Sequence, residues 1–460
     1  METHAVEPGD RLGRMFGTDG VRGVAGADLS VELTVALGRA GAMLLGQRSG
    51  RRPRLLVGRD TRRSGTMLEA ALSAGAMSVG ADVWSLGVAT TPAVAHLVRI
   101  LEFDAGVVIS ASHNPAPYNG IKFFDGSGYK LPDSLEDEIE HRLQWRRLED
   151  RGPGPTGAEL GVLTPAAGEL ESYVAFIAAV AGDLAGLRIV CDCANGAAWR
   201  LAPEAFRRAG ADVYTIFCDP NGLNINEGCG SLFPEALQTA VRERGADLGL
   251  AFDGDADRLI AVDEKGQVVD GDHMLAVLGL DLLWRDALPG RTVVGTVMSN
   301  YGLEVALAQA GGRLVRTRVG DRYVLEEMRQ AGYVLGGEQS GHIILLDHHT
   351  TGDGLCTAAA LAALMRRKGS PLSELAAVMP QMPQVLKSVP VRTRDGWDRN
   401  DTIQAAIATA EGVLAGRGRV VVRPSGTEPL LRIMVEGEDE SVVRGQAEAL
   451  TQVVRQELGG

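Results

Sequence analysis

Three aspartates at alternate positions form the pattern in this sequence that most directly suggests chemistry. Asp253, Asp255 and Asp257 stand in the run DGDADR, between two short apolar stretches. Alternate carboxylates can converge on one hard cation only where the backbone curls around it, and Gly254 makes such a curl easier. Three carboxylates suit Mg²⁺, which takes a few of them and leaves positions for phosphate oxygens. The alternative is a solvated acidic hairpin tip without a metal.

A calcium-binding EF-hand loop also begins with aspartates at alternate positions, and Glu264 falls at its twelfth place. Two features argue against an EF-hand. The sixth place is Arg258, where that loop needs glycine for its sharp turn. The flanking stretches are also typical of strands, whereas an EF-hand loop lies between helices. The run therefore predicts a magnesium site between two strands.

A serine-containing run, SASHNP, occupies Ser110–Pro115 and follows an apolar strand at residues 106–109. Open α/β folds bind ligands outside the carboxyl ends of their strands, which is where this serine pair would lie. A serine hydroxyl is a poor nucleophile unless a neighbouring group activates it. The alternative is a plain turn, because Asn-Pro favours turns and Ser or Asn can cap the backbone there.

A candidate phosphate site lies near the end of the chain, in the run RPSGTEP that starts at Arg423. The arginine offers a fork of donors, and Ser425, Gly426 and Thr427 offer hydroxyl and backbone N–H groups in a tight loop. Together these groups could form a nest for a phosphate dianion. The same pattern is also a good hairpin without any ligand.

A polyol site is suggested by the run GGEQSGH, in which Glu338 and Ser340 alternate and can present both side chains toward sugar hydroxyls. A glycine-rich turn explains the same run without a ligand. Lys122 and Arg22 each stand near a glycine turn, where a cation can face either phosphate or water.

The elements that must position these loops follow a weak internal repeat. A strand, a helix, a glycine turn and a second strand occur in the same order three times, with first strands starting near residues 54, 187 and 292. Short apolar strands that alternate with helices form βαβ units and mostly parallel sheets. The repeat therefore predicts three α/β domains.

A fourth domain is expected after about residue 379, where the pattern changes to a strand, a helix, two strands and a final helix. The Gly- and Pro-rich stretch 151–164 is a candidate linker after the first domain. We expect three tandem similar α/β domains with mixed, mostly parallel sheets and a small C-terminal α+β domain, around a central cleft. The predicted domains are 1–160, 161–264, 265–376 and 377–460.

Composition limits the class of protein. The chain has 460 residues, 45% hydrophobic and 23% charged, which is ordinary globular composition. Its net charge of −13 disfavours nucleic-acid binding. Five cysteines without a repeated C-x-x-C spacing indicate reduced thiols. No leader and no long apolar run is apparent, so we expect a soluble, cytoplasmic protein without a membrane partner.

The motifs are more specific together than singly. SASHNP, NGIKFF, DGDADR, GGEQSGH and RPSGTEP, in this order over nearly the whole chain, resemble the α-D-phosphohexomutase superfamily, which has one signature loop in each of four domains. MFGTDGVRG at residues 15–23, GEQSGH, and DHHTTGDG at residues 347–354 resemble the bacterial branch that acts on glucosamine phosphate. Relatives that act on mannose or glucose phosphates more often have GEMSGH, where this chain has Gln339.

The resemblance implies a role for each matching residue. Ser112 would carry the transferable phosphate, and with Asp253, Asp255 and Asp257 it would bind one Mg²⁺ per active site. Lys122 and Arg22 would flank the transferring phosphoryl group, and Lys122 is our candidate for assisting proton transfer at the sugar hydroxyl. The implied catalytic residues are Ser112, His113, Lys122 and Arg22. The implied substrate-binding residues are Arg258, Glu338, Ser340, Arg423, Ser425, Gly426 and Thr427.

The implied reaction converts glucosamine 6-phosphate into glucosamine 1-phosphate through a hexosamine 1,6-bisphosphate intermediate or activator, and so feeds UDP-N-acetylglucosamine and cell-wall precursor synthesis. The partner would be a small sugar phosphate, and a homodimer is the candidate assembly. Three alternatives remain at this stage: a mutase for mannose or glucose phosphates, a metal-dependent phosphohydrolase with a serine nucleophile, and a Ca²⁺- or sugar-phosphate-binding protein without activity. A simple hydrolase has no reason to keep a separate phosphate nest.

Overall fold

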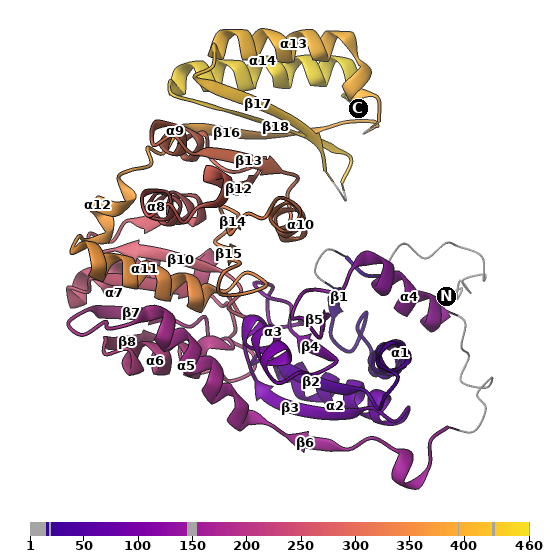
Figure 1. Ribbon diagram of the computed structural model, residues 1–460. Coiled ribbons are helices and arrows are strands. Elements are labelled where there is room, and N and C mark those ends of the chain that lie inside the picture. The colour runs from indigo at the N-terminus through magenta and orange to yellow at the C-terminus, as the bar shows by residue number, and fades with distance from the viewer. Residues whose placement is uncertain (1–14, 18–19, 145–153, 394, 426–427, 460) are drawn as a thin grey trace.

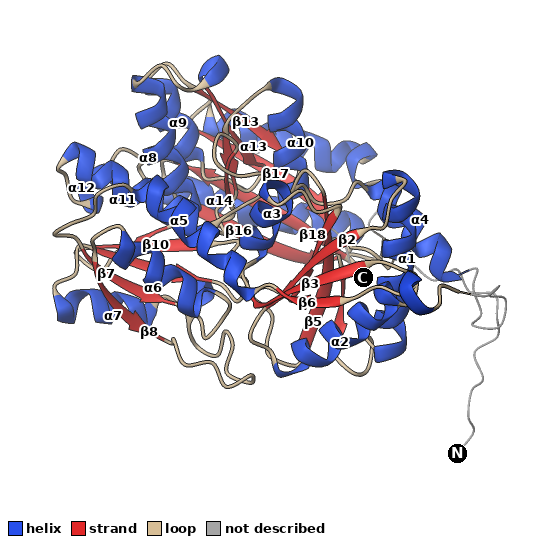
Figure 2. Cartoon of the chain, turned by 60° about the horizontal axis from the view of Figure 1, so that its bottom comes forward, coloured by secondary structure: helices blue, strands red, loops and turns tan. Residues whose placement is uncertain are grey.

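The chain folds into four sheets that follow one another along the sequence (Figure 1). The structure, a computed structural model, describes residues 15–17, 20–144, 154–393, 395–425 and 428–459. The first three sheets are mixed and covered by helices, as Figure 2 shows, and the fourth is antiparallel. The predicted fold class, three α/β domains and a small C-terminal α+β domain, is confirmed.

Domain I contains a six-stranded sheet in the order β1-β5-β4-β2-β3-β6. Its strands are β1 (Val21–Val24), β2 (Arg54–Arg59), β3 (Asp82–Val88), β4 (Ala105–Ile109), β5 (Tyr118–Asp125) and β6 (Leu163–Pro165). Its helices are α1 (Val31–Ser49), α2 (Arg63–Met77), α3 (Thr91–Ile100) and α4 (Asp133–Gln144). Leu55 and Val57 pack on the side of α1 and α2, whereas Leu56 packs on the side of α3. Burial on both faces explains why β2 is apolar without alternation.

The end of the predicted linker is part of this first sheet. Residues 163–165 form β6, which pairs parallel with β3, and the turn at Gly157–Glu159 precedes it. A strand of three residues with two exposed positions has no apolar pattern, so only its pairing with β3 reveals it. The first sheet therefore extends past the boundary predicted at residue 160, and the boundaries at 264 and 376 stay predictions.

Domains II and III share one apolar core, which contains residues from Tyr173 to Met379 and also Ala93 of domain I. Domain II has strands β7 (Arg188–Asp192), β8 (Asp212–Ile216), β9 (Leu248–Phe252), β10 (Leu259–Asp263) and β11 (Val268–Val269), and helices α5 (Leu170–Ala181), α6 (Ala198–Arg208) and α7 (Glu235–Arg244). Domain III has strands β12 (Thr292–Thr296), β13 (Arg313–Thr317), β14 (Leu335–Gly337) and β15 (Ile343–Leu345), and helices α8 (Gly271–Trp284), α9 (Tyr301–Gln309), α10 (Asp321–Ala331), α11 (Gly354–Lys368) and α12 (Leu372–Ala376).

The internal repeat is confirmed, because β2–β3, β7–β8 and β12–β13 are all parallel neighbours. In each copy the first strand also pairs in parallel with the third strand, which is β4, β9 or β14. This third strand forms an antiparallel hairpin with the strand that follows it. These hairpins are β4–β5, β9–β10 and β14–β15. SASHNP, DGDADR and the end of GGEQSGH are the loops of these three hairpins. The repeat thus places one signature loop at the same position of each sheet.

Domain IV consists of β16 (Gln384–Pro390), α13 (Asp401–Leu414), β17 (Gly418–Pro424), β18 (Leu430–Gly437) and α14 (Glu440–Leu458). Its sheet has the order β16-β18-β17, and Figure 1 shows both helices on the outer side. RPSGTEP spans the β17–β18 hairpin. The domain is joined to domain III by hydrogen bonds from Arg419 to Ser299 O at 2.7 Å and from Tyr301 to Gly416 O at 2.6 Å.

None of the helices in the described part of the chain is long and apolar enough to cross a membrane. All five cysteines are free thiols.

Candidate active site

Ser112 lies in the loop that follows β4 and is 1% exposed. Its backbone is left-handed, with φ of 51°, a conformation that costs a non-glycine residue about 1–3 kcal/mol and is concentrated at functional sites. The Ser110 hydroxyl accepts a hydrogen bond from Ser112 N at 2.9 Å. The Ser112 hydroxyl then points at Asp253, with its Oγ 2.5 Å from Asp253 Oδ2. The serine predicted from the motif is therefore held against the aspartate run.

A buried arginine, Arg62, holds the backbone of this loop. Its guanidinium donates to three carbonyl oxygens, those of Ser112 at 2.9 Å, Asn114 at 2.7 Å and Pro115 at 2.5 Å. The same guanidinium pairs with Asp60 at 2.8 Å, and both side chains are fully buried. Asp60 also accepts from the Ser110 hydroxyl at 2.6 Å. One ion pair thus fixes the conformation that presents Ser112.

Replacing Arg62 with methionine is expected to destabilise the protein by about 3–5 kcal/mol, because Asp60 would remain as an uncompensated buried charge. Urea-induced unfolding followed by circular dichroism measures this. Arg63 is the matched control, since it is the next residue and is exposed. Arg63→Met should change stability by no more than about 0.5 kcal/mol. A loss below about 1 kcal/mol for Arg62→Met would contradict the role assigned to this ion pair.

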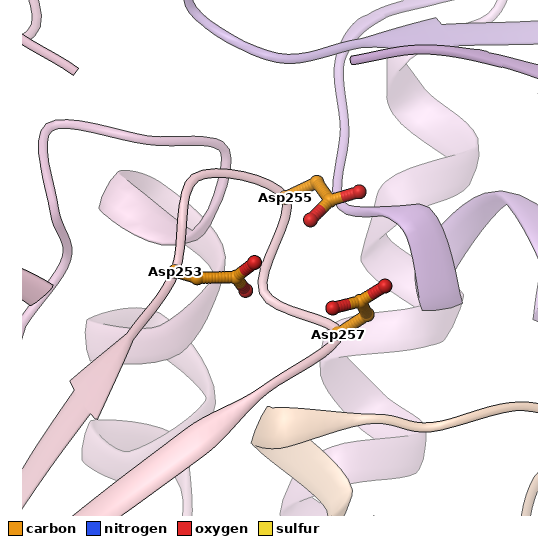
Figure 3. A group of neighbouring side chains, drawn as sticks. All are labelled: Asp253, Asp255 and Asp257. Carbon is orange, nitrogen blue, oxygen red and sulfur yellow. The ribbon is translucent and has the colours of Figure 1, made fainter. Parts of the chain in front are cut away.

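The three aspartates predicted to bind metal form one cluster. Their carboxylate oxygens lie within 4.8 Å of one another, and all three side chains are buried. Figure 3 shows them gathered where the loop between β9 and β10 curls. The left-handed backbone of Ala256, with φ of 58°, contributes to this curl. The antiparallel strands on both sides agree with the choice of a strand-flanked site over an EF-hand.

The serine loop and the aspartate loop pack backbone against backbone. A Cβ atom at Gly254 would lie only 2.5 Å from Ser112 O, so this contact requires glycine. Asn226 holds the serine loop, because its side-chain amide donates to Ser112 O at 2.9 Å and to Asn114 O at 3.1 Å. A further turn, Cys193–Gly196, lies next to the aspartate loop. Ala197, the residue after this turn, donates its N–H to Gly254 O at 2.8 Å.

Lys122, on β5, provides the cation nearest to the aspartates. Its Nζ lies 2.8 Å from Asp255 Oδ2 and 3.7 Å from Asp257 Oδ2, and the residue is 2% exposed. Thr91, at the start of α3, donates to the same Asp255 oxygen at 2.6 Å. The cluster is thus organised by residues from two domains.

The electrostatics of the cluster are those of a cation site. Burial raises the pKa of Asp253 well above its ordinary range, and the charges of Asp257 and Asp255 add to this. For Asp257 burial also acts to raise the pKa, but Lys122, His342 and Arg258 lower it well below that range. The oxygen Asp255 Oδ1 is buried and accepts no hydrogen bond from any described residue. Hard, anionic and incompletely satisfied oxygens fit a divalent ion such as Mg²⁺.

His113 lies beside the serine, and Arg22 and Arg258, both predicted from the sequence, are close enough for their charges to act on it. The pKa of His113 falls to about 4, because burial and the charges of Arg258 and Arg22 disfavour its protonation. His113 is therefore neutral at physiological pH, with Nδ1 3.2 Å from the Ser112 hydroxyl oxygen. Arg258 N donates to Asp253 Oδ1 at 3.2 Å, and Arg22 on β1 lies opposite Gly120 of β5.

The third signature loop touches the aspartate loop through its last residues. Gly341 O accepts from Leu259 N at 3.0 Å, and His342 Nδ1 lies 3.7 Å from Asp257 Oδ1. Burial acts to lower the pKa of His342, but Asp257 and Asp321 raise it above its ordinary value. Sequence reasoning did not assign His342 to the site, although it ends the GGEQSGH run.

The two predicted sugar-binding residues differ in their surroundings. Ser340 is exposed, whereas Glu338 is half-buried and accepts a hydrogen bond from Gly320 N, just before α10, at 3.0 Å. Between them, the side-chain amide of Gln339 donates to Asp270 at 3.3 Å. The residue that separates GEQSGH from GEMSGH thus supports the loop through Asp270.

The DHHTTGDG stretch connects three domains. Thr350 donates to Gly128 O at 2.6 Å, and the His349 ring lies 3.0 Å from Pro92 O, both in domain I. Asp353 caps α11 and accepts a hydrogen bond from Tyr173 of domain II at 2.9 Å. This stretch therefore sets the relative positions of the loops.

The predicted phosphate site lies in domain IV, where Arg423 and Ser425 are described and Gly426 and Thr427 lie outside the described residues. Arg423 stands directly opposite Arg432 across the β17–β18 ladder. Burial and the charge of Arg432 lower the pKa of Arg423. Like charges placed opposite each other destabilise a sheet. An anion bound near the pair would relieve this repulsion.

Several residues that shape the site were missed by sequence reasoning. They are Asp60, Arg62, Thr91, Asn226, His342 and Arg432. The run GRDTR at residues 58–62 offered one signal, because charged residues directly after an apolar parallel strand lie at the ligand-binding edge of a sheet. The roles of Asn226 and Arg432 depend on contacts that no local pattern encodes.

Comparisons with known proteins agree with this geometry. Four family profiles of phosphoglucomutase/phosphomannomutase match the chain in order: alpha/beta/alpha domain I at residues 13–148, domain II at 171–266, domain III at 270–382 and the C-terminal domain at 386–453.

Individual relatives match over nearly the whole length. The phosphoglucosamine mutase of Symbiobacterium thermophilum is 57% identical over 97% of this chain and 99% of its own. That of Moorella thermoacetica is 58% identical over 93% of this chain and 96% of its own. Among solved structures, a phosphoglucomutase/phosphomannomutase family protein from Burkholderia thailandensis has a TM-score of 0.81 at 24% identity, covering 97% of this chain and 99% of its own. Aspergillus fumigatus N-acetylphosphoglucosamine mutase, in complex with GlcNAc-6P and magnesium, has a TM-score of 0.67 at 19% identity, covering 96% and 95%.

Proposed function

The chain belongs to the phosphoglucomutase/phosphomannomutase family, and from this premise we propose that it interconverts glucosamine 6-phosphate and glucosamine 1-phosphate. The choice of glucosamine rests on the phosphoglucosamine mutases that match the chain over nearly their full length. The product would feed UDP-N-acetylglucosamine and cell-wall precursor synthesis.

One observation carries the proposed chemistry: the Ser112 hydroxyl oxygen lies 2.5 Å from Asp253 within the aspartate cluster. A phosphate attached to that oxygen would sit directly beside the carboxylates, and only a cation can make such a contact favourable. Asp253, Asp255 and Asp257 would hold Mg²⁺ together with the phosphate of Ser112. When bound, the ion would offset the negative charge that spreads over the phosphoryl oxygens during transfer.

In the proposed cycle Ser112 begins as phosphoserine. The bond between its Oγ and phosphorus breaks, a bond from phosphorus to a sugar hydroxyl oxygen forms, and a hexosamine 1,6-bisphosphate results. The bisphosphate then turns end for end, and its other phosphoryl group returns to Ser112 as the product leaves. The neutral ring of His113, 3.2 Å from the Ser112 hydroxyl oxygen, could take the hydroxyl proton. Lys122, our candidate from the sequence, would have to give up its own proton first, because it is paired as a cation with Asp255.

The two ends of the intermediate need two binding sites of different kinds. Arg423, Ser425, Gly426 and Thr427 would hold the phosphate that is not reacting, and we add Arg432 because it stands opposite Arg423. Glu338 and Ser340 would bind sugar hydroxyls between the two phosphates, while Arg22 and Arg258 would contact the reacting phosphate. The central cleft that would enclose the substrate is part of this proposal.

The alternative activities require different sets of binding and catalytic groups. A phosphohydrolase needs no second phosphate site, and a binding protein needs no serine held against the aspartates. A mutase for mannose or glucose phosphates uses the same residues, so substrate preference must be measured.

Cytoplasmic location, with the cysteines reduced, and assembly as a homodimer are further parts of our proposal. Size-exclusion chromatography with light scattering tests whether the protein is a homodimer.

We expect kcat/KM for glucosamine 6-phosphate to exceed that for mannose 6-phosphate and glucose 6-phosphate by at least about tenfold. Hydrogen bonds to a substrate group that the competitors lack supply discrimination of this size or more. Coupled assays with each sugar phosphate and a trace of the matching bisphosphate measure the three values. A preference for mannose phosphate would overturn the choice of substrate while leaving the mutase chemistry in place.

Two variants of the third loop refine this test. Gln339→Met should leave the preference nearly unchanged, because the Gln339 amide already bonds Asp270. Ser340→Ala should lower kcat/KM for all three sugars, because Ser340 is exposed and is proposed to bind a sugar hydroxyl. If Gln339→Met reversed the preference, residue 339 would contact the sugar directly.

A further inference from the structure

Two cysteines on neighbouring strands of domain II lie close enough to react with each other. Cys193 follows β7 and Cys218 follows β8, and Cys193 N bonds Ile216 O at 3.2 Å where these parallel strands end. The Cys193 thiol hydrogen bonds to Cys218. If the β7–β8 register continues, Cys193 lies opposite Phe217, so Cys218 is its diagonal neighbour. A strand spacing of about 5 Å and a rise of about 3.3 Å per residue then place the two Cα atoms roughly 6 Å apart, within the range of about 4.4–6.8 Å that disulfides require.

Cys218 can be reached from outside, whereas Cys193 cannot. Cys193 is fully buried, but Cys218 is half-buried and lines an open cavity of about 640 Å³. Arg200, Glu204, Arg207 and Arg208 also line this cavity. Arg208 is paired with Glu171 and Glu204, so Arg200 and Arg207 supply the positive charge that an anionic or polar oxidant would meet. The Cys218 sulfur is fixed by a hydrogen bond to Trp199 O at 2.8 Å.

Cys218 also differs from the other cysteines in acidity. Its pKa is lowered to about 7, chiefly by the hydrogen bond from Cys193, with help from Thr215 and Arg207. Burial raises the pKa of Cys191, Cys229 and Cys356, and the pKa of Cys193 is raised by its hydrogen bond to Cys218 and by burial. Oxidation depends on thiolate character and access, so Cys218 is the thiol at which it should begin.

The cysteine pair is joined to the metal cluster by one short turn. Cys193 O accepts from Gly196 N at 2.7 Å, and the turn contains two left-handed residues, Ala194 with φ of 52° and Asn195 with φ of 48°. A Cβ at Gly196 would lie 2.5 Å from Gly254 O of the aspartate loop. The turn and the aspartate loop are thus in direct backbone contact, and Ala197 N donates to Gly254 O at 2.8 Å, so these contacts connect a shift of Cys193 to Gly254.

We propose that Cys218 and Cys193 form a disulfide in response to peroxide, and that the bond weakens metal binding at the aspartate cluster by displacing the Cys193–Gly196 turn. The Cys218 thiolate attacks hydrogen peroxide, which breaks the O–O bond, gives a sulfenic acid and releases hydroxide. The Cys193 thiol then attacks the sulfenic sulfur, the S–S bond forms, and the oxygen leaves as water. Two thiols and one peroxide thus give one disulfide and two waters, and a dithiol reverses the change.

The experiment treats the reduced full-length protein with hydrogen peroxide, alkylates the remaining thiols and measures the intact mass. We expect two of the five thiols to be consumed, and peptide mapping to find Cys193 linked to Cys218. Thermal unfolding with Mg²⁺ as the only added ligand then compares metal affinity before and after oxidation. Affinity should fall by about fivefold or more and return after dithiothreitol treatment. This readout needs no sugar, so it is independent of the proposed reaction.

Matched serine variants identify the residues responsible. Cys218→Ser should abolish both the disulfide and the loss of Mg²⁺ affinity, whereas Cys356→Ser, at a buried cysteine in α11, should keep both. Cys218→Ala serves as a second variant if the serine variant folds poorly. The proposal is overturned if all five thiols survive, if Cys191 replaces Cys193 in the link, if Cys218 is oxidised further without a link, or if the disulfide leaves Mg²⁺ affinity unchanged.

Discussion

Ser112→Ala is expected to abolish mutase turnover and to remove a phosphate adduct from the intact mass of the purified protein. Without the Oγ oxygen, no phosphoserine can form and the sugar has no phosphoryl donor. Removing a group that forms the covalent intermediate costs at least about 10³-fold in kcat. Mass spectrometry and a coupled assay for glucosamine 1-phosphate formation measure the two effects on the same sample.

The control for this variant is Ser127→Ala, at an exposed serine whose hydroxyl donates to Asp125. It should keep both the adduct and full activity. The Mg²⁺-dependent rise in melting temperature should survive in Ser112→Ala, because all three aspartates remain. Normal turnover by Ser112→Ala would show that the mechanism is wrong, whichever sugar is the substrate.

Asp253→Asn should have opposite effects on activity and on metal-free stability. Losing a carboxylate from the cation site should remove several kcal/mol of charge stabilisation, which lowers kcat by roughly 100-fold or more. Without metal, however, the variant should be more stable than the natural protein, because burial and two neighbouring aspartates disfavour the charge at this position. An asparagine can still accept from Arg258 N and bond the Ser112 hydroxyl.

The stability gain should depend on pH in a defined direction. The pKa of Asp253 is raised in the folded protein, so the folded state holds this proton more tightly than the unfolded chain, whose carboxyl has a pKa of about 3.9. As pH rises from about 4 through the raised pKa, the metal-free natural protein loses stability at this group. The advantage of Asp253→Asn should grow over the same range.

Unfolding by urea in the presence of a chelator, at several pH values, measures this difference. Asp212→Asn, at an exposed aspartate on β8, should change neither stability nor activity appreciably. Saturating Mg²⁺ should raise the stability of the natural protein above that of Asp253→Asn, because only the intact cluster gains binding energy. A destabilised metal-free variant with undiminished Mg²⁺ binding would contradict the assignment of the site.

Strands and helices with strong local patterns could be predicted almost to the residue. The first strands of the repeat, predicted to start near residues 54, 187 and 292, start at residues 54, 188 and 292. β6 could not be predicted, because three residues with two exposed side chains have no periodicity and depend on β3 for their hydrogen bonds. Arg62 could not be assigned either, since its partners Asn114 and Pro115 are more than 50 positions away.

The sequence alone determined which chemical groups are available and that they belong to loops after strands, because motif spacing and hydrophobic periodicity are local properties. The tertiary structure decided which groups meet. The bond from Ser112 to Asp253 joins residues 141 positions apart, and that from Lys122 to Asp255 joins residues 133 apart. No local preference can specify such contacts. They arise because three sheets of the same topology each present the same hairpin loop, and burial of their shared surfaces fixes how those loops converge.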